Sequence, residues 1–304
     1  MGVRTFDGGA PAAVFSFLDD AVSKRGREHW NWKYRLKASQ GPSAFYWEDA
    51  DGSILGFIGL MHTSLRTQGQ EHRGAWFVDW HVRAGEQGVG VGIGLLRKAE
   101  AAAGMLLTLQ GSADTQKILP RLGWKQSFSP STWVRPLTPR FISQWIEQRM
   151  GGRLRGATRA LGMAASAYLR CGRPTPPPGC ELVDVDRFPA EYDEVWKGRA
   201  ADFEPAMLRD SAYMNYLCAD YPDGGYRVQL LSLRGETVGH LISRLDVDRG
   251  GLTRGRIVDA LWPKQPARPA AWLVQSACRQ LQEAGADYLE CVASTPDLLA
   301  AHSR

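Results

Sequence analysis

The sequence predicts an α+β protein with two similar domains, each built on a mixed, largely antiparallel sheet flanked by helices. Three observations lead to this prediction. The 304 residues are enough for about two domains with cores of their own. Similar segments recur after about 180 residues. In both halves the order is an aromatic helix, two strands around a glycine turn, a buried strand, a helix and a strand.

The repeat consists of four pairs of segments. Residues 30–34 and 213–216 are aromatic, 52–56 and 235–239 begin and end with glycine, 76–79 and 256–259 end in aspartate, and 103–107 and 284–288 begin with Ala-Gly. The order of the four pairs is the same in both halves. We therefore interpret the second half as a duplicate of the first.

A basic segment followed by prolines separates the two halves. Residues 151–173 contain five arginines and no acidic residue, which accounts for the net charge of +5. Their apolar residues recur at helical spacing, which favours a solvated linker helix over a site for phosphate or for a membrane surface. Pro174 and Pro176–Pro178 then stop the helix. We expect domains at 1–138 and 180–304, joined by a linker at 139–179.

Composition excludes several classes of protein. With 44% hydrophobic and 23% charged residues, the chain is neither disordered nor fibrous. It has no run of about 18 apolar residues and no leader-like start, so we expect a cytoplasmic protein without an integral membrane segment. The five cysteines form no C-x-x-C pair, which predicts reduced, mostly buried thiols and no metal site.

A glycine loop joins a buried strand to a helix in the first half. The strand, residues 76–82, leads into the loop, residues 87–92, and the helix follows at 93–103. Glycines let a backbone approach an anion closely, and the start of a helix carries partial positive charge. The loop lacks the Gly-Lys-Ser/Thr ending of nucleotide hydrolases, and no acidic residue follows where a dinucleotide site needs one. A different phosphate ligand is indicated.

These residues resemble the GNAT superfamily of acyl-coenzyme A N-acyltransferases. Gln87-Gly88-Val89-Gly90-Val91-Gly92 matches the superfamily's Q/R-x-x-G-x-G/A pyrophosphate loop, and residues 113–124 resemble its later helix and Leu-Gly-aromatic ending. The resemblance covers residues 30–126, and the second half looks like a degenerate copy. It implies acetyl-CoA or another acyl-CoA as cofactor and a small amine or amino sugar as acceptor, with no nucleic-acid partner; homodimer formation stays open.

The resemblance also implies a set of cofactor-binding residues. Backbone amides of the loop would hold the pyrophosphate, and the end of the preceding strand would contact the pantetheine arm and the acyl carbonyl. The predicted residues are His81, Val82, Gln87, Gly88, Val89, Gly90, Val91 and Gly92.

Asp79 and His81 are the candidate catalytic residues. Strand alternation places them on one face and Val78, Trp80 and Val82 on the other. The attacking amine must lose a proton, and a histidine, with an ordinary pKa of ~6.5, can accept it. Both residues have a structural alternative, because a histidine on a strand is commonly structural and Asp259 is the counterpart of Asp79 in the half without the loop.

The general acid of the superfamily is missing. Its tyrosine on the last helix aligns with Leu119. The thiolate would then leave unassisted or through water, or a tyrosine would come from elsewhere. The aromatic residues Trp30, Trp32, Tyr34, Tyr46 and Trp47 could stack on a sugar, but core packing is the favoured interpretation.

The second half lacks the glycine loop. Residues 262–269 contain three prolines and no glycine, so coenzyme binding should be lost there and the copy should serve as a lid, a wall of the acceptor site or a dimer surface. The second half has no counterpart of Gly123-Trp124, where the last strand of the first half is expected. The last strand of the second domain is therefore either missing or supplied by another segment.

Three functions remain open. The first is an acyl-CoA N-acyltransferase, with acetyl the preferred group. The second is a relative of the Fem-type aminoacyl transferases, which pair two such domains. The third is a non-catalytic binding or scaffold protein of the same fold.

Overall fold

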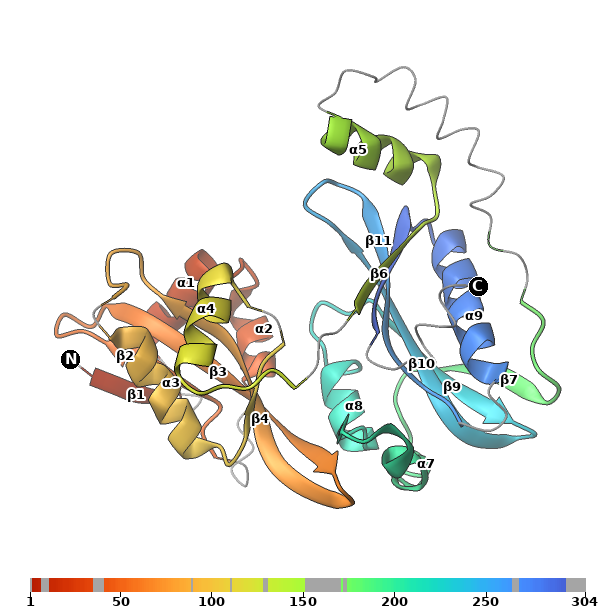
Figure 1. Cartoon of the computed structure of the whole chain (residues 1–304), viewed down its shortest axis with the longest axis horizontal. Coiled ribbons are helices and arrows are strands. Elements are labelled where there is room, and N and C mark those ends of the chain that lie inside the picture. The colour runs from red at the N-terminus through yellow and green to blue at the C-terminus, as the bar shows by residue number, and fades with distance from the viewer. Residues whose placement is uncertain are drawn as a thin grey trace. The chain divides into compact units, whose positions relative to one another are not determined.

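A computed structural model describes residues 2–6, 11–34, 41–88, 90–109, 111–127, 131–150, 171, 174–263 and 268–293. The chain forms two compact units. The first unit combines residues 1–125 with 200–223, and the second combines 126–199 with 224–304. Each unit contains one of the two mixed sheets (Figure 1).

The first sheet has the strand order β1-β2-β3-β4-β5. Its strands are β1 (Gly2–Phe6), β2 (Ala44–Glu48), β3 (Ile54–Thr67), β4 (Gln70–Val82) and β5 (Leu106–Leu107). Neighbouring strands are antiparallel except for the parallel pair β4 and β5. Its helices are α1 (Ala12–Ala21), α2 (Gly26–Lys33), α3 (Val91–Ala102) and α4 (Ala113–Arg121).

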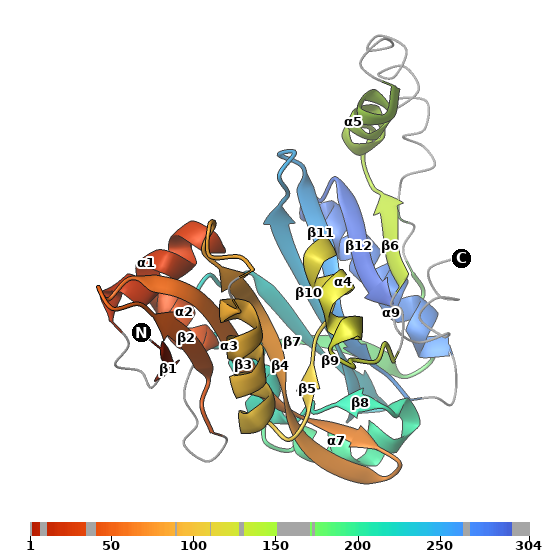
Figure 2. The same ribbon diagram turned by 60° about the vertical axis from the view of Figure 1, so that its left-hand side comes forward.

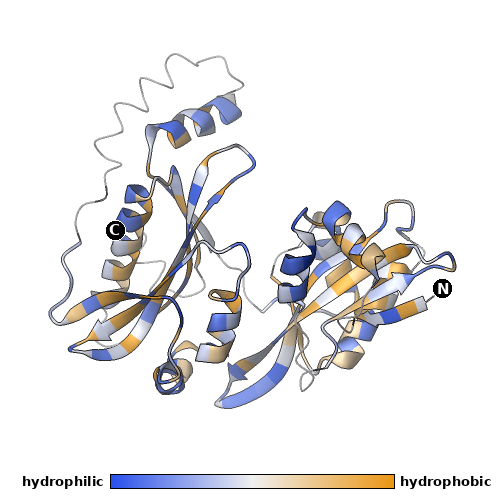
Figure 3. Cartoon of the chain, turned by 180° about the vertical axis from the view of Figure 1, so that it is seen from behind, coloured by the Kyte–Doolittle hydropathy of each residue, from blue (hydrophilic) through white to orange (hydrophobic). Residues whose placement is uncertain are grey.

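Helices cover both faces of the first sheet (Figure 2). On one face, α1 and α2 bury Phe15, Leu18 and Trp30 against Phe6 and Phe57 of the strands. On the other face, the apolar side of α3 and Leu119 of α4 pack on β2, β3 and β4. Hydrophobic residues are accordingly concentrated along these strands (Figure 3). The sheet is buried on both faces, as in a mixed sheet between helical layers.

A segment from later in the chain completes the first unit. It contains η1 (Ala200–Phe203), β8 (Ala206–Met207) and α8 (Ser211–Leu217). Strand β8 pairs with β3, and α8 packs on α2. Trp32 Nε1 donates to the carbonyl of Tyr216 at 2.7 Å, and the Tyr216 hydroxyl donates to the carbonyl of Lys33 at 2.7 Å. These contacts place residues 200–223 with the first unit, contrary to the range 180–304 expected for one domain.

The second sheet has the order β6-β12-β11-β10-β9-β7. Its strands are β6 (Ser131–Pro136), β7 (Cys180–Val185), β9 (Tyr226–Leu233), β10 (Glu236–Val247), β11 (Thr253–Leu261) and β12 (Tyr288–Ala293). Its described helices are α5 (Pro139–Met150), α7 (Tyr192–Arg199) and α9 (Arg268–Glu283). From β7 to β12 the strand order and directions repeat those of β1 to β5, including one parallel pair, β11 and β12.

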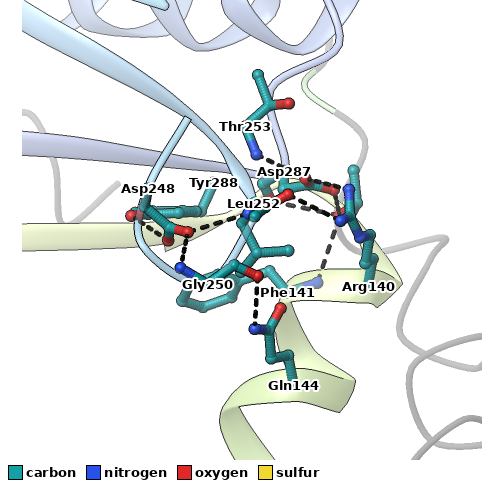
Figure 4. A network of polar contacts seen from close by, with 11 residues as sticks. Arg140, Phe141, Gln144, Asp248, Gly250, Leu252, Thr253, Asp287 and Tyr288 are labelled. Carbon is teal, nitrogen blue, oxygen red and sulfur yellow. Dashed lines mark hydrogen bonds and ion pairs between the residues drawn. The ribbon is translucent and has the colours of Figure 1, made fainter. Parts of the chain in front are cut away.

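Strand β6 and helix α5 belong to the second unit. Strand β6 pairs antiparallel with β12, so a segment from the first half of the sequence supplies a strand to the second sheet, as one of the two expectations had it. Figure 4 shows the contacts that attach α5 to the second sheet. Arg140 donates to the Asp287 carboxylate at 3.1 Å, and Gln144 donates to the carbonyl of Gly250 at 3.1 Å. The Asp287 carboxylate also accepts from the Thr253 amide at 2.9 Å. The expected ranges 1–138 and 139–179 therefore do not match the compact units, because β6 and α5 pair and pack with the second sheet.

The contact between α2 and residues 200–223 should weaken in acid. His29 is buried at 8% exposure among Trp30, Trp32 and Tyr221, with Nδ1 3.7 Å from Asp223. Burial, with help from Lys33, lowers the pKa of His29. When the pH falls below the ordinary pKa of histidine, His29 is protonated in the unfolded chain but stays neutral in the folded chain. The folded state therefore loses stability as the pH falls.

We expect urea unfolding of the full chain to show a free energy that falls from about pH 7 to about pH 5, and His29→Gln to flatten this dependence by at most about 1.4 kcal/mol per pH unit. His72→Gln, on the exposed part of β4, is the control. An unchanged slope in His29→Gln would contradict this assignment.

Candidate functional site

The glycine loop leads directly into helix α3. Gly90 is the residue before the helix, with φ of +89°, and Gly88 has φ of +98°. A β-carbon at either position would meet no atom within 4 Å, so the left-handed backbone is the reason for glycine there. Gln87, Gly88 and Gly90 are exposed, and Val89 lies outside the described residues. The loop presents open backbone to solvent.

The start of α3 has the geometry of an anion site. Among the described residues, the first hydrogen bond with helical spacing runs from the Gly94 amide to the Gly90 carbonyl at 2.8 Å. Amides before that point have no carbonyl one turn earlier, and the helix dipole adds partial positive charge. The predicted use of the Gly90, Val91 and Gly92 amides for a pyrophosphate is compatible with this geometry.

Close packing fixes α3 on the sheet. A β-carbon at Gly92 would lie 3.1 Å from Val82 Cγ2, and one at Gly94 would lie 2.6 Å from Trp47 Cζ3. Trp80 Nε1 donates to the carbonyl of Gly92 at 3.1 Å. Gly92 therefore serves helix packing as well as the loop, and only its amide is available to a ligand. Gly94 is a second packing glycine, which the loop motif alone does not indicate.

Among the described strands, the end of β4 has a pairing partner on one side only, because β5 is shorter than β4. Strand β5 pairs with β4 only at Ala75 and Trp76. In the described part of the chain, no strand pairs with residues 77–82 on that side. Main-chain donors and acceptors in this stretch can bind an extended ligand beside the start of α3.

A β-bulge interrupts the end of β4. Phe57 pairs with His81 and Gly59 with Val78, so Ile58 stands opposite the two residues Asp79 and Trp80. Asp79 has φ of +51°. The bulge shifts the alternation of the strand: Val78 packs with the α1 and α2 core, whereas Trp80 and Val82 pack with the α3 core. The expected placement of Val78 beside Trp80 and Val82 is therefore wrong.

Asp79 is held on the α2 side of the sheet. Lys33 Nζ lies 2.6 Å from Asp79 Oδ2, and the Tyr34 hydroxyl donates to the same oxygen. The side chains of Lys33 and Asp79 are only 18% and 12% exposed. Burial, then the Asp79 charge, raises the pKa of Tyr34 well above its ordinary value. Tyr34 stays protonated, and Asp79 joins the bulge to the end of α2.

His81 lies on the same side of the sheet as Asp79, as the alternation predicts. Its ring meets the edge of Phe17 of α1 at a centroid distance of 6.0 Å, and the side chain is partly exposed. Within the described ranges, no hydrogen bond or ion pair engages the imidazole. His81 is therefore available to bind or move a proton, whereas Asp79 already has two partners.

The position of the missing acid is part of the core. Leu119 of α4 is 7% exposed and packs against the α3 side of the sheet. The aromatic residues Trp30, Trp32, Tyr34 and Tyr46 are also buried, which confirms core packing and rules out a sugar platform at these four positions. Trp47 is partly buried under Gly94.

The second unit has a bulge and an aspartate at the same place. The register of β10 and β11 breaks between Ile242 and Ser243, next to Asp259. His240 Nε2 lies 3.3 Å from Asp259 Oδ2, and His240 Nδ1 lies 2.5 Å from the Tyr192 hydroxyl. His240 is fully buried. In both units the aspartate at the bulge takes part in polar contacts between the sheet and a helix, directly in the first unit and by way of His240 in the second, which supports a structural role for Asp79.

Other features of the described chain lie away from this site. A hollow of about 430 Å³ between α5 and the β10–β11 turn contains none of the predicted site residues.

In the described ranges, no helix is long and apolar enough to cross a membrane, and no group of three or more metal-binding side chains occurs. None of the five cysteines, all of which the structure describes, forms a disulfide, and Cys218, Cys278 and Cys291 are buried. Residues 264–267, part of the proline segment, lie outside the described residues.

Comparison with known proteins identifies the fold. No family model and no curated protein matches the sequence. Among solved structures, N-myristoyltransferase from Saccharomyces cerevisiae with bound myristoyl-CoA is 13% identical with a TM-score of 0.61, covering 99% of this chain and 78% of that one. A GCN5-related N-acetyltransferase from Anabaena variabilis is 14% identical with a TM-score of 0.64, covering 98% and 67%.

A protein from Enterococcus faecalis described as a probable N-acyltransferase is 10% identical with a TM-score of 0.58, covering 95% of this chain and 64% of its own. At these identities the likeness concerns the fold alone. The expected α+β class and the resemblance to the GNAT fold are confirmed.

The packing of α3 can be tested with two alanine variants. Gly94→Ala introduces a methyl group into the space of the Trp47 ring and should lower the free energy of unfolding by about 1–2 kcal/mol, although alanine favours a helix. Gly198 of α7 has no neighbour within 4 Å of a β-carbon, so Gly198→Ala should raise stability by up to about 1 kcal/mol. Urea unfolding measures both, and equal effects would show that α3 does not pack as described.

Proposed function

We propose that this chain, which has the GNAT-like fold of acyl-coenzyme A N-acyltransferases, transfers an acyl group, acetyl in the simplest case, from coenzyme A to an amine. The acceptor is a small amine or an amino sugar. One observation carries the proposal: an exposed left-handed glycine loop begins α3 beside the unpaired end of β4. This arrangement offers one place for a diphosphate and an adjacent edge for an extended arm.

The chain's own backbone would bind the coenzyme. Amides from Gly88 to Gly92, with Gln87 at the entrance, would hold the pyrophosphate. His81 and Val82, at the end of β4, would pair with the pantetheine arm and place the acyl carbonyl near main-chain donors. Such donors stabilise the negative charge that develops on the carbonyl oxygen during attack. The thioester supplies the activated acyl group.

His81 would accept the proton of the attacking amine. It is partly exposed, and among the described residues no polar partner competes for its nitrogens. Asp79 would act as a positioning residue, because its carboxylate is engaged by Lys33 and Tyr34. With Leu119 buried at the position of the superfamily's acid, the thiolate would leave without a side-chain donor from α4.

A binding or scaffold function is the second candidate. It is favoured by the missing acid at Leu119 and by the proline Pro263 that follows β11 in place of a glycine loop. Acyl-CoA binding without release of free thiol in the presence of amines would favour this candidate.

Coenzyme binding is tested by thermal shift. Acetyl-CoA at about 100 times its Kd should stabilise the wild type by about 2.7 kcal/mol. Gly90→Glu should abolish the shift, because the carboxylate repels the diphosphate. Gly235→Glu is the matched control: Gly235 has nearly the same φ, +88°, and equally open space, but lies in the β9–β10 turn of the second unit. Both variants carry similar backbone strain, so a ligand shift retained in Gly90→Glu would refute the site.

The roles of His81 and Asp79 are separated by two variants. His81→Ala should lower kcat about 10²- to 10⁴-fold and leave stability and acetyl-CoA binding nearly unchanged. Asp79→Asn should instead destabilise the protein by about 1–3 kcal/mol, since Lys33 and Tyr34 lose a charged acceptor. Thiol release and urea unfolding are the measurements. An His81→Ala variant with wild-type turnover would remove His81 from the mechanism.

A further inference from the structure

Two of the five cysteines are in contact in the second unit. The side chains of Cys171 and Cys278 lie close enough for their thiols to interact. The Cys171 amide donates to Gln282 Oε1 at 2.9 Å, and Gln282 Nε2 donates to the carbonyl of Leu137 at 2.9 Å. Cys278 and Gln282 are one turn apart on α9, on the same side of the helix. Cys171 is thus fixed beside Cys278 by a backbone contact that does not involve sulfur.

The two thiols differ in access to solvent. Cys171 is half-buried, whereas Cys278 is 1% exposed. A small molecule can therefore reach Cys171 more readily than Cys278. This is the arrangement of an attacking thiol and a resolving thiol.

Positive charge surrounds the pair. The hydrogen bond from Cys278, together with Arg135 of β6 and Arg279 of α9, lowers the pKa of Cys171 to about 7. Hydrogen bonding with Cys171 and burial raise the pKa of Cys278. Burial raises the pKa of the other partly exposed cysteine, Cys180, and brings that of Cys291 to about 12. Cys171 therefore carries more thiolate near neutral pH than these two cysteines.

We infer that Cys171 and Cys278 form a dithiol site that reacts with low-molecular-weight disulfides and closes to an internal disulfide. The Cys171 thiolate attacks one sulfur of the small disulfide, forms a mixed disulfide and releases one small thiolate. Cys278 gives its proton to that thiolate and attacks the Cys171 sulfur, which releases the second small thiolate. That thiolate takes from water the proton that Cys171 had lost on ionisation. The two cysteines are oxidised, and one small disulfide is reduced to two thiols.

The bond would fasten Cys171, just after the basic segment, to helix α9. Because the two residues are far apart in sequence, a cross-link between them restricts the unfolded chain strongly. Oxidation should therefore raise the melting temperature of the full chain, and dithiothreitol should reverse the rise.

Oxidised glutathione is the probe. Incubation of the full chain near pH 7 should consume two of the five thiols, and peptide mapping without reductant should join the peptides of Cys171 and Cys278. Cys278→Ser should stop at one glutathione adduct on Cys171, and Cys171→Ser should leave Cys278 unmodified. Cys291→Ser is the matched control, since it removes another buried cysteine of the same unit and should react as the wild type does.

Rates complete the test. At neutral pH Cys171 should react roughly five- to tenfold faster than Cys180, after the lower nucleophilicity of a more acidic thiol is taken into account. A stable Cys171 adduct in the wild type without the internal bond would overturn the inference. Modification of Cys180 at an equal rate, or no loss of thiols, would overturn it as well.

Discussion

Helix α3 can lie where it does only because two of its residues have no side chain. Gly92 and Gly94 leave room for Val82 and Trp47, and the Trp80 indole bonds the Gly92 carbonyl. These contacts bring the first turn of the helix onto the end of β4. The left-handed loop before the helix is consequently fixed next to a strand edge that lacks a partner. The candidate site is a product of this packing, and no single side chain creates it.

The bulge in β4 has a different role from that of the glycine loop. Both units have a register break and an aspartate at this place, but the described residues after β11 include Pro263 where the first unit has its loop. In the first unit the aspartate bonds Lys33 and Tyr34 at the end of α2. In the second it bonds His240 of β10, which in turn bonds Tyr192 of α7. We conclude that the bulge supports the fold, whereas the glycine loop is the feature that points to a ligand.

The sequence predicted those features that depend on interactions between residues close together in the chain. Strand, loop and helix around Gly90 follow from periodicity and glycine placement, and the burial of Leu119 agrees with the missing acid. The bulge at Asp79 could not be read from the strand pattern, because it is set by pairing with β3. The same holds for β6 with β12 and for α8 with α2, which join residues far apart in the chain. The pairing of Cys171 with Cys278 likewise depends on a tertiary contact, and neither spacing nor motif indicates it.

Hydrogen–deuterium exchange with and without acetyl-CoA tests the central claim most directly, because it locates the protected amides. We predict that acetyl-CoA slows exchange at residues 87–93 and at the end of β4, and that the start of α9 is unaffected. Protection centred on α9, or no protection in the loop at a ligand concentration that stabilises the protein, would contradict the proposed anion site.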